Sequence, residues 1–350
     1  MTSIVMNSSN GTFWKFLPCN MVTVTHSDSL HLGVSVFYVT IIIVLILAIL
    51  IGNTLVVLAV HRTAQLQLTS NWMLVRLSCS DLTVALVILI SVIFQPHVIT
   101  SFHLDPFHMC LIRLTFMAIP ACVSAFHLTM IAFDRYIAIS RPLRYHQIMT
   151  PRRGQAMIAF CWIYGSFLML LPIFGWRKDR PTDTTSFICL YAKVYEPSYV
   201  WFILFVGFIP VCSLLAVFYL LLFMQAYKTT RQILSQQHNL NTSTNVPAKT
   251  ELKAVKTVLV IVGVFAVCWI PTVCLIGIES QTKEFSYDCS AYYLERFLFL
   301  MALSNSAMNP VIYGYRNADF RKAFHKIIGS LCRKICSLQM CAIIPVLHND

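Results

Sequence analysis

The sequence predicts an all-α fold: a bundle of seven membrane-spanning helices with a short amphipathic eighth helix on the cytoplasmic face. The chain of 350 residues is 57% hydrophobic and only 11% charged, and its mean hydropathy is +0.71. A soluble chain of this length is seldom so poor in charge. Its apolar residues gather in seven stretches, each long enough for the roughly 20 residues that cross hydrocarbon. Polar groups inside these stretches lie at matching depths, which indicates a switch built inside a membrane.

The seven stretches divide the chain into an extracellular N-terminal segment (1–31), a membrane domain (32–315), and an amphipathic helix with a cytoplasmic tail (316–350). Proline and glycine interrupt two of the stretches, which membrane helices tolerate better than soluble ones do. In chain order the predicted spans are Leu32–Val60, Thr69–Gln95, Phe107–Ala138, Ala156–Trp176, Pro197–Ala226, Val255–Ile278 and Tyr292–Tyr315.

The basic residues set the orientation. With the N-terminus outside, 18 of the 26 Lys and Arg residues fall on the inner side, as the positive-inside bias requires. The net charge of +12 therefore predicts a cytoplasmic face near anionic lipid and no nucleic-acid partner. The first span is too long for a cleavable signal peptide and can insert by itself. Together these features predict a multi-pass protein of the plasma membrane.

Two further stretches fit this orientation. Asn7-Ser8-Ser9 and Asn10-Gly11-Thr12 are glycosylation sequons that precede the first span. The stretch Gln236–Pro247, between spans five and six, is polar and has the composition of a linker. A basic amphipathic stretch, Asn317–Leu331, predicts the eighth helix, and Cys332 and Cys336 just after it are palmitoylation candidates.

The remaining cysteines divide by depth. Cys110 heads the third span on the outer side and Cys189 lies in the long outer loop before span five. A bridge between them would tie that loop across the mouth of the bundle in an oxidising compartment. Cys19 and Cys289 are also external, so a second pairing is open to them. No cysteine spacing indicates a metal site.

A polar set lies at mid-membrane depth on spans two, three and seven. A carboxylate at this depth costs about 2.5–3.5 kcal/mol unless it is paired. One interpretation is an ion-binding, state-dependent network with sodium as the ion. The other is hydrogen bonding that holds helices together. The members of the set are Asp81, Ser124, Asn305, Ser306 and Asn309.

A second polar group closes the inner end of the third span, Asp134-Arg135-Tyr136. A cluster of charges is costly at the edge of hydrocarbon. Glu251, at the foot of span six, could form an ion pair with Arg135 whose opening frees the arginine. A plain surface ion pair is the alternative.

These residues resemble the rhodopsin-like (class A) G-protein-coupled receptors over essentially the whole chain. The resemblance implies capture of an extracellular ligand, outward movement of span six, a heterotrimeric G protein as partner and arrestin as a further one. It also implies switch residues on spans six and seven: Phe265, Trp269, Pro271 and Pro310, with Tyr313 and the Asp134–Tyr136 triplet on the G-protein side. One departure is Phe218, where the family has a tyrosine; Tyr219 follows one place later. The match rests on Gly52-Asn53, Leu77 with Asp81, Cys110, Asp134-Arg135-Tyr136, Trp162, Cys189, Pro210, Phe265, Cys268–Pro271 and Asn309–Tyr313.

Within this family the transmission core is similar to that of adenosine receptors, but the pocket positions differ. The asparagine that such receptors use on span six is Ile276 here, the loop pair Phe-Glu is Tyr191-Ala192, and the span-seven histidine is Leu303. A purine would lose its polar partners, so adenosine is not the expected ligand. Met117 replaces the aspartate of amine receptors, and Leu303 also stands where photopigments carry lysine.

The expected ligand site is therefore apolar and aromatic, with a few polar points. A transporter or channel is the alternative from another class, but it calls for a polar path or for broken helices in two halves. No nucleophile–base pair or metal cluster indicates an enzyme. The site is expected to be lined by Met117, Tyr191, Phe202, Thr272 and Phe299.

Overall fold

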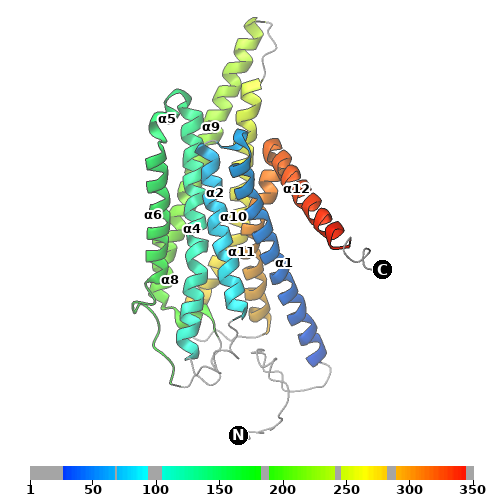
Figure 1. Cartoon of the computed structure of the whole chain (residues 1–350). Coiled ribbons are helices and arrows are strands. Elements are labelled where there is room, and N and C mark those ends of the chain that lie inside the picture. The colour runs from blue at the N-terminus through cyan, green and yellow to red at the C-terminus, as the bar shows by residue number, and fades with distance from the viewer. Residues whose placement is uncertain are drawn as a thin grey trace, which may run out of the picture.

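The computed structural model describes residues 27–67, 69–93, 105–182, 189–240, 246–281 and 289–343. Within these ranges the chain forms a bundle of long helices that run alternately up and down (Figure 1). The long helices are α1 (Ser27–Arg62), α2 (Thr69–Ile93), α4 (Pro106–Ser140), α6 (Pro151–Leu170), the continuous run α8–η4–α9 (Pro197–Ile203, Leu204–Phe208, Ile209–Leu240), α10 (Val246–Gln281), α11 (Cys289–Arg316) and α12 (Ala318–Ile343). Short elements connect them: η2 (Ala64–Leu66), η3 (Pro142–Arg144), α5 (Tyr145–Ile148) and α7 (Tyr191–Val194).

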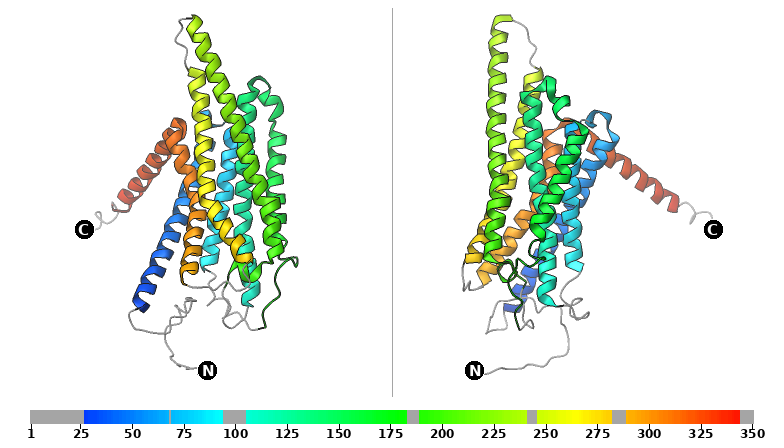
Figure 2. Two further views of the ribbon diagram at one scale, coloured as in Figure 1. Left: turned by 180° about the vertical axis from the view of Figure 1, so that it is seen from behind. Right: turned by 90° about the vertical axis from the view of Figure 1, so that its left-hand side faces the viewer.

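The two ends of the bundle differ in shape. We call the end at which α1 and α8 begin the outer end, after the orientation predicted from the basic residues, and the opposite end the inner end. At the inner end α9 and α10 extend beyond the other long helices, and α12 leaves the bundle at an angle (Figures 1 and 2). The inner end is therefore where helices project beyond the body of the bundle.

Local capping fixes where several helices begin. The Asp105 carboxylate accepts the backbone N–H of His108 at 3.2 Å, and a proline occupies the first position of α4. Thr150 caps α6 in the same way, accepting from the backbone of Arg153 at 3.4 Å, again before a proline. Asn317 separates α11 from α12, and its side chain accepts the backbone N–H of the second residue of α12 at 2.9 Å. These side chains satisfy backbone donors that a helix start leaves open.

The fourth span is shorter than predicted. We expected a helix to Trp176, but α6 ends at Leu170 and a turn follows. Pro172 has no N–H to continue the ladder and restricts the residue before it. Gly175 then takes a φ of 124°, which L-residues with side chains rarely adopt. The segment stays apolar as far as Trp176, but the backbone cannot continue as a helix beyond Leu170.

Two other boundaries differ in the opposite sense. The polar stretch Gln236–Pro247 was interpreted as a linker, yet α9 continues to Leu240 and α10 begins at Val246. The expected eighth helix is longer than predicted, since α12 has 26 residues and ends at Ile343. Helix α9 thus covers the first five residues of the polar stretch and α10 its last two. The position of α12 on the cytoplasmic face stays a prediction.

The run from α8 to α9 contains a π-helical turn, η4, that the sequence did not predict. Such turns insert one residue into the helical ladder and often mark functional sites. Here η4 ends at Phe208, two residues before Pro210. The proline, which lacks a backbone N–H, therefore follows an already widened turn. The turn shifts the register of α9 relative to α8.

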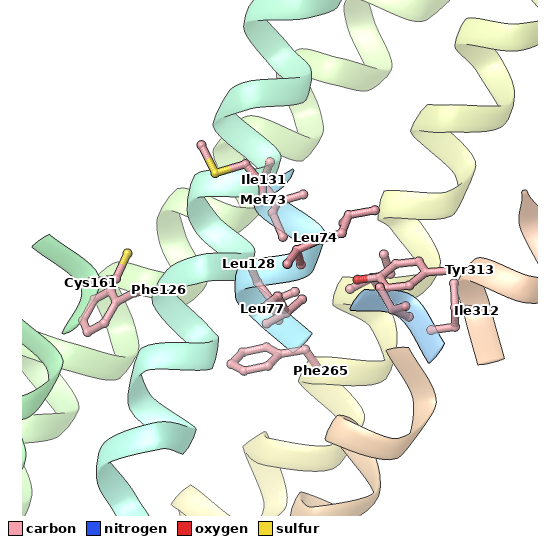
Figure 3. Close-up of a cluster of buried hydrophobic side chains, with 14 of the residues drawn as sticks. Met73, Leu74, Leu77, Phe126, Leu128, Ile131, Cys161, Phe265, Ile312 and Tyr313 are labelled. Carbon is pink, nitrogen blue, oxygen red and sulfur yellow. The ribbon is translucent and has the colours of Figure 1, made fainter. Parts of the chain in front are cut away.

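Helix α4 occupies the centre of the bundle and packs against α2, α6 and α9. Its inner half joins the largest cluster of buried side chains, which Figure 3 shows drawn from α2, α4, α6, α10 and α11. Leu77 and Phe265 of this cluster are almost fully buried. In lipid such packing acts mainly through van der Waals contact, because the solvent is equally apolar.

The outer surface of the bundle suits a lipid environment. Large apolar side chains such as Ile51, Ile163 and Val267 are more than half exposed, and soluble proteins rarely expose so many together. Within the described ranges, five helices are long and apolar enough to cross a membrane: Val36–Arg62, Asn71–Ser91, Pro106–Ser140, Pro197–Gln225 and Leu259–Gln281. The other two long helices of the bundle are less apolar, since α6 opens with two arginines and α11 carries the polar side chains described next.

Candidate functional site

The buried carboxylate of Asp81 lies at the junction of α2, α4 and α11. One oxygen, Oδ1, accepts from Ser306 Oγ at 2.8 Å and from Ser124 Oγ at 3.3 Å. The other, Oδ2, accepts from Asn309 Nδ2 at 2.9 Å. Asp81 has no exposed surface. The structure thus connects four residues of the predicted polar set; the fifth, Asn305, is buried but forms no hydrogen bond with Asp81.

A second set of contacts fastens α1 to α11 just beside this network. Asn53 Nδ2 donates to the carbonyl of Ser306 at 3.1 Å and to that of Ile49 at 3.0 Å. A Cβ on Gly52 would lie 2.9 Å from Pro310 Cγ, closer than real side chains approach. Glycine at position 52 therefore lets α1 approach Pro310 of α11 closely, beside the hydrogen bond from Asn53 to Ser306.

The donors around Asp81 are two hydroxyls and one amide. Hydroxyl and carboxylate oxygens are the hard ligands that a small cation such as sodium prefers, so the chemistry of this set fits the predicted ion. No group of three or more His, Cys, Asp or Glu side chains that could hold a metal occurs among the described residues. The network of oxygen atoms thus fits both of the interpretations drawn from the sequence, a sodium site and hydrogen bonding that joins helices.

At the inner end, Asp134 is held mainly by a tyrosine. Its Oδ1 accepts from Tyr145 Oη at 2.8 Å, whereas the nearest contact with Arg135, Nε to Oδ2, is 4.0 Å. Asp134 is fully buried and Arg135 is 21% exposed. Tyr145 lies outside the span, and burial, together with the Asp134 charge and hydrogen bond, raises its pKa, so it stays a donor at physiological pH. Asp134 thus anchors α5 to α4, while the guanidinium of Arg135 is only loosely tied to it.

Two buried tyrosine hydroxyls stand near this switch. Tyr219 and Tyr313 have no hydrogen-bond partner for their hydroxyls among the described residues. Tyr313 lies within electrostatic range of both Asp81 and Arg135, and Figure 3 shows its ring directed from α11 into the buried cluster. Phe218, at the family's tyrosine position, instead packs its ring 5.5 Å from that of Phe133. Tyr313 is therefore placed between the buried network and the inner switch.

The expected switch on α10 is an aromatic column. Phe265 lies 6.4 Å from Trp269 and equally 6.4 Å from Phe208, measured between ring centroids. Phe208 is the last residue of the π turn η4, and Pro271 lies within α10 two residues after Trp269. The column therefore connects the proline bend of α10 to the π turn before α9.

At the outer end a disulfide joins Cys110 of α4 to Cys189, with their Cα atoms 5.4 Å apart. The bridge holds the start of α7, Tyr191, in an apolar cluster with the first turns of α4. The expected pocket residues Met117 and Phe299 belong to a neighbouring cluster of α1, α2 and α11.

The two remaining residues expected in the pocket, Phe202 and Thr272, both contact other parts of the protein. Phe202 packs 4.9 Å from the ring of Trp176. The Thr272 hydroxyl donates to the carbonyl of Leu298 at 3.2 Å, so it ties α10 to α11. A helix-joining role explains Thr272 without a ligand.

Several predicted sites lie outside the described residues or have side chains that are not described. Asn7, Asn10 and Cys19 belong to residues 1–26. The backbones of Glu251, Cys289 and Cys336 are helical, but their side chains are not described; Cys332 is described and exposed.

Sequence reasoning missed Tyr145 as a partner of Asp134. It lies eleven residues along the chain, across the short helix η3, so no periodicity connects the two.

Comparison with known proteins places these features in a family. Residues 52–313 match the family model described as 7 transmembrane receptor (rhodopsin family). The chain is similar to the adenosine receptor A2b of Gallus gallus, with 33% identity over 86% of this chain and 91% of that protein. It is similar to the adenosine receptor A2b of Rattus norvegicus, at 32% over 79% of this chain and 85% of that one. It is also similar to the adenosine receptor A2a of Homo sapiens, at 32% over 85% of this chain and 73% of that one.

Proposed function

Because this chain belongs to the rhodopsin family of seven-transmembrane receptors, we propose that it binds its ligand at the outer end and signals through movement of α10. Activation of heterotrimeric G proteins in response to an extracellular ligand is the general function of this family. The chain is a multi-pass membrane protein, and the relatives that cover most of it are receptors rather than enzymes.

The arrangement of Asp134 and Arg135 carries the proposal. One oxygen of the buried carboxylate, Oδ1, accepts from Tyr145, so Asp134 is held in place without a close contact to the arginine. Arg135, 4.0 Å away, is free to turn toward a partner once α10 moves outward and opens a cavity beside it. There its guanidinium donates to carbonyls at the end of the G protein's C-terminal helix. The aromatic column from Trp269 to Phe208 supports α10 as the moving element.

The orientation and modifications follow from the same function. We place the N-terminus outside the plasma membrane, with Asn7 and Asn10 glycosylated. The cytoplasmic face then includes α12, whose Cys332 and Cys336 are palmitoylated and whose basic residues meet anionic lipid. Arrestin docks at the same inner face as the G protein.

We propose that sodium binds at the carboxylate of Asp81. The cation binds between Asp81 and Ser124 and favours the resting state, since it binds only the arrangement in which these groups converge. Binding residues in this proposal are Asp81, Ser124 and Ser306, all of which present oxygen atoms. The hydrogen bonds that now satisfy the carboxylate support the site because they show the oxygens converging.

The ligand is a molecule other than adenosine. The relatives described above are named for adenosine, but three pocket positions differ here. Ile276 packs in an apolar cluster with the outer turns of α4, and Leu303 is 4% exposed in another. Apolar side chains at these positions leave the hydrogen-bonding edge of a purine without partners.

The test compares three inner substitutions at matched surface expression, reading nucleotide exchange on added G protein. Arg135→Ala should remove coupling and leave ligand binding intact, while Glu251→Ala should raise basal exchange by loosening the resting state. Arg141→Ala is the matched control, because Arg141 is an exposed arginine six residues further along. Normal coupling by Arg135→Ala would show that the mechanism is wrong in its central residue.

A further inference from the structure

Arg113 is a charged side chain within the third membrane span that has no evident structural role. It lies one helical turn inward from the disulfide at Cys110 and is exposed. Arg113 forms no hydrogen bond or ion pair in the part of the chain that the structure describes. An ionisable group within a span is costly and is by default a candidate for function.

A second arginine converges on Arg113 from another helix. Arg296 of α11 lies within electrostatic range of Arg113, as do the hydroxyls of Tyr38 and Tyr191. The Arg296 guanidinium carbon lies 4.6 Å from the centroid of the Tyr38 ring. Helices α1, α4, α7 and α11 thus each direct one of these side chains to the same region. Two guanidinium groups at this range repel one another unless an anion lies between them.

Two carboxylates stand nearby but do not neutralise Arg113. Glu295 lies within electrostatic range of Tyr191 and of Glu279. Neither glutamate is among the groups that act on Arg113, and both have interactions of their own. Among the described groups that act on Arg113, only the guanidinium of Arg296 carries a charge at neutral pH.

The surface directly inward of both arginines is apolar. Met117 follows Arg113 by four residues on α4, and Phe299 follows Arg296 by three on α11, so each lies on the face of its arginine. Both belong to a single apolar cluster together with Tyr38. A positive region thus sits immediately above an apolar one.

We propose that the ligand is an amphipathic organic anion, with its carboxylate or phosphate bound between Arg113 and Arg296 and its apolar body against Met117 and Phe299. The planar guanidinium presents paired donors that match either group, and the Tyr191 hydroxyl adds another. This inference rests on the proposed receptor function and names the chemistry of its ligand.

The test uses probes that share one apolar body and differ in the head group. Decanoate, decyl phosphate, decanol and decylamine are added below their micelle concentrations to the full chain in lipid nanodiscs, and a naphthylmethyl series repeats the set. Binding is read as a shift in thermal unfolding, and signalling as nucleotide exchange on added G protein. We expect both anions to bind, with the alcohol weaker and the amine inactive; the preferred anion distinguishes carboxylate from phosphate.

Substitutions then identify the binding groups. Arg113→Gln should weaken anion binding by about 10- to 100-fold, the usual loss for one hydrogen bond to a charged group, and Arg296→Gln should do likewise. Arg113→Lys should recover part of the affinity, which a merely structural role would not require. Arg180→Gln, which removes an outer arginine paired with Asp105 at 3.0 Å, is the control and should bind as the wild type.

The outcomes separate this inference from the receptor function. Failure of all the anions to bind, stronger binding of the amine, or anion binding that Arg113→Gln leaves unchanged would each overturn it. Basal exchange that requires Arg135 but ignores the anions would overturn it and leave the receptor function standing. Anion-dependent stabilisation without exchange on any G protein would overturn the receptor function and leave the anion site standing.

Discussion

Replacement of Asp81 by asparagine separates the two interpretations of the buried network. The substitution removes the negative charge but keeps the size and most of the hydrogen-bonding capacity of the side chain. In the wild type, Ser306, Asn309 and Ser124 donate to the carboxylate at 2.8, 2.9 and 3.3 Å. In Asp81→Asn the remaining oxygen still accepts from both serines, but the new amide faces another donor, the amide of Asn309.

Two opposing terms of similar size then act on stability. A buried donor left without its acceptor costs about 1–3 kcal/mol. Removal of a carboxylate from mid-membrane depth relieves a cost of about 2.5–3.5 kcal/mol, reduced by the pairing it had. The terms nearly cancel, so the free energy of unfolding without sodium should change by less than about 2 kcal/mol. The sodium effect has no such compensation, because the cation requires the charge.

The assay is thermal unfolding of the purified receptor in sodium chloride and in choline chloride at equal ionic strength. At ten times its dissociation constant, sodium should stabilise the wild type by about 1.4 kcal/mol, and Asp81→Asn should lose this difference. Ser124→Ala is the control, since it removes the longest hydrogen bond and keeps the charge; part of the sodium effect should remain. An unchanged sodium effect in Asp81→Asn would show that the network only joins helices.

Three further predictions concern the outer end and the helix contact at Pro310. Cys110→Ser should cost about 2–5 kcal/mol and reduce surface expression; non-reducing peptide maps of the wild type should show Cys110 linked to Cys189, and a free Cys110 would contradict this. Burial raises the pKa of Asp105, but its contacts with His108 and Arg180 lower the pKa by more, so the pKa lies below its usual range. These contacts therefore stabilise the folded state above about pH 4, and the stabilisation is lost as the pH falls through the folded pKa. Asp105→Asn should show a flatter acid unfolding curve than the wild type. Gly52→Ala should destabilise by about 1–3 kcal/mol through overpacking, whereas Gly33→Ala, with nothing within 4 Å of the new Cβ, should unfold at the wild-type temperature.

The sequence predicted the bundle and the order of its helices because hydropathy reports the membrane directly. It also grouped Asp81, Ser306 and Asn309, since buried polar residues at equal depth in one bundle can find hydrogen-bond partners mainly in one another. It could not predict that α6 ends early, because Pro172 acts on the backbone and leaves the hydropathy of the segment unchanged. The π turn η4 likewise has no signature in the apolar pattern.

The contacts that the sequence missed depend on how loops fold back. Tyr145 reaches Asp134 only through the turn that η3 makes. Arg113 and Arg296 are far apart in the sequence, and only the packing of α11 in the bundle brings them within electrostatic range. Pattern arguments treat each helix alone, so they find the polar residue within a span but not its partner on a connecting segment. The ligand positions were predicted from family correspondence and stay predictions; for Thr272 the structure adds a hydrogen bond that joins α10 to α11.

Buried polar atoms at the inner end connect the two polar sites with the expected movement of α10. Asp134 is buried and accepts from Tyr145 through Oδ1, while its Oδ2 and the Tyr313 hydroxyl are buried without a hydrogen-bond partner among the described residues. A buried hydroxyl without a partner costs about 1–3 kcal/mol, which an arrangement that supplies a partner would recover. Tyr313 lies within range of both Asp81 and Arg135, so movement of α10 that opens space beside it changes both sites together. A ligand at the outer end then needs to favour the open arrangement by only a few kcal/mol, since about 5.5 kcal/mol already converts a 1:99 population into its reverse.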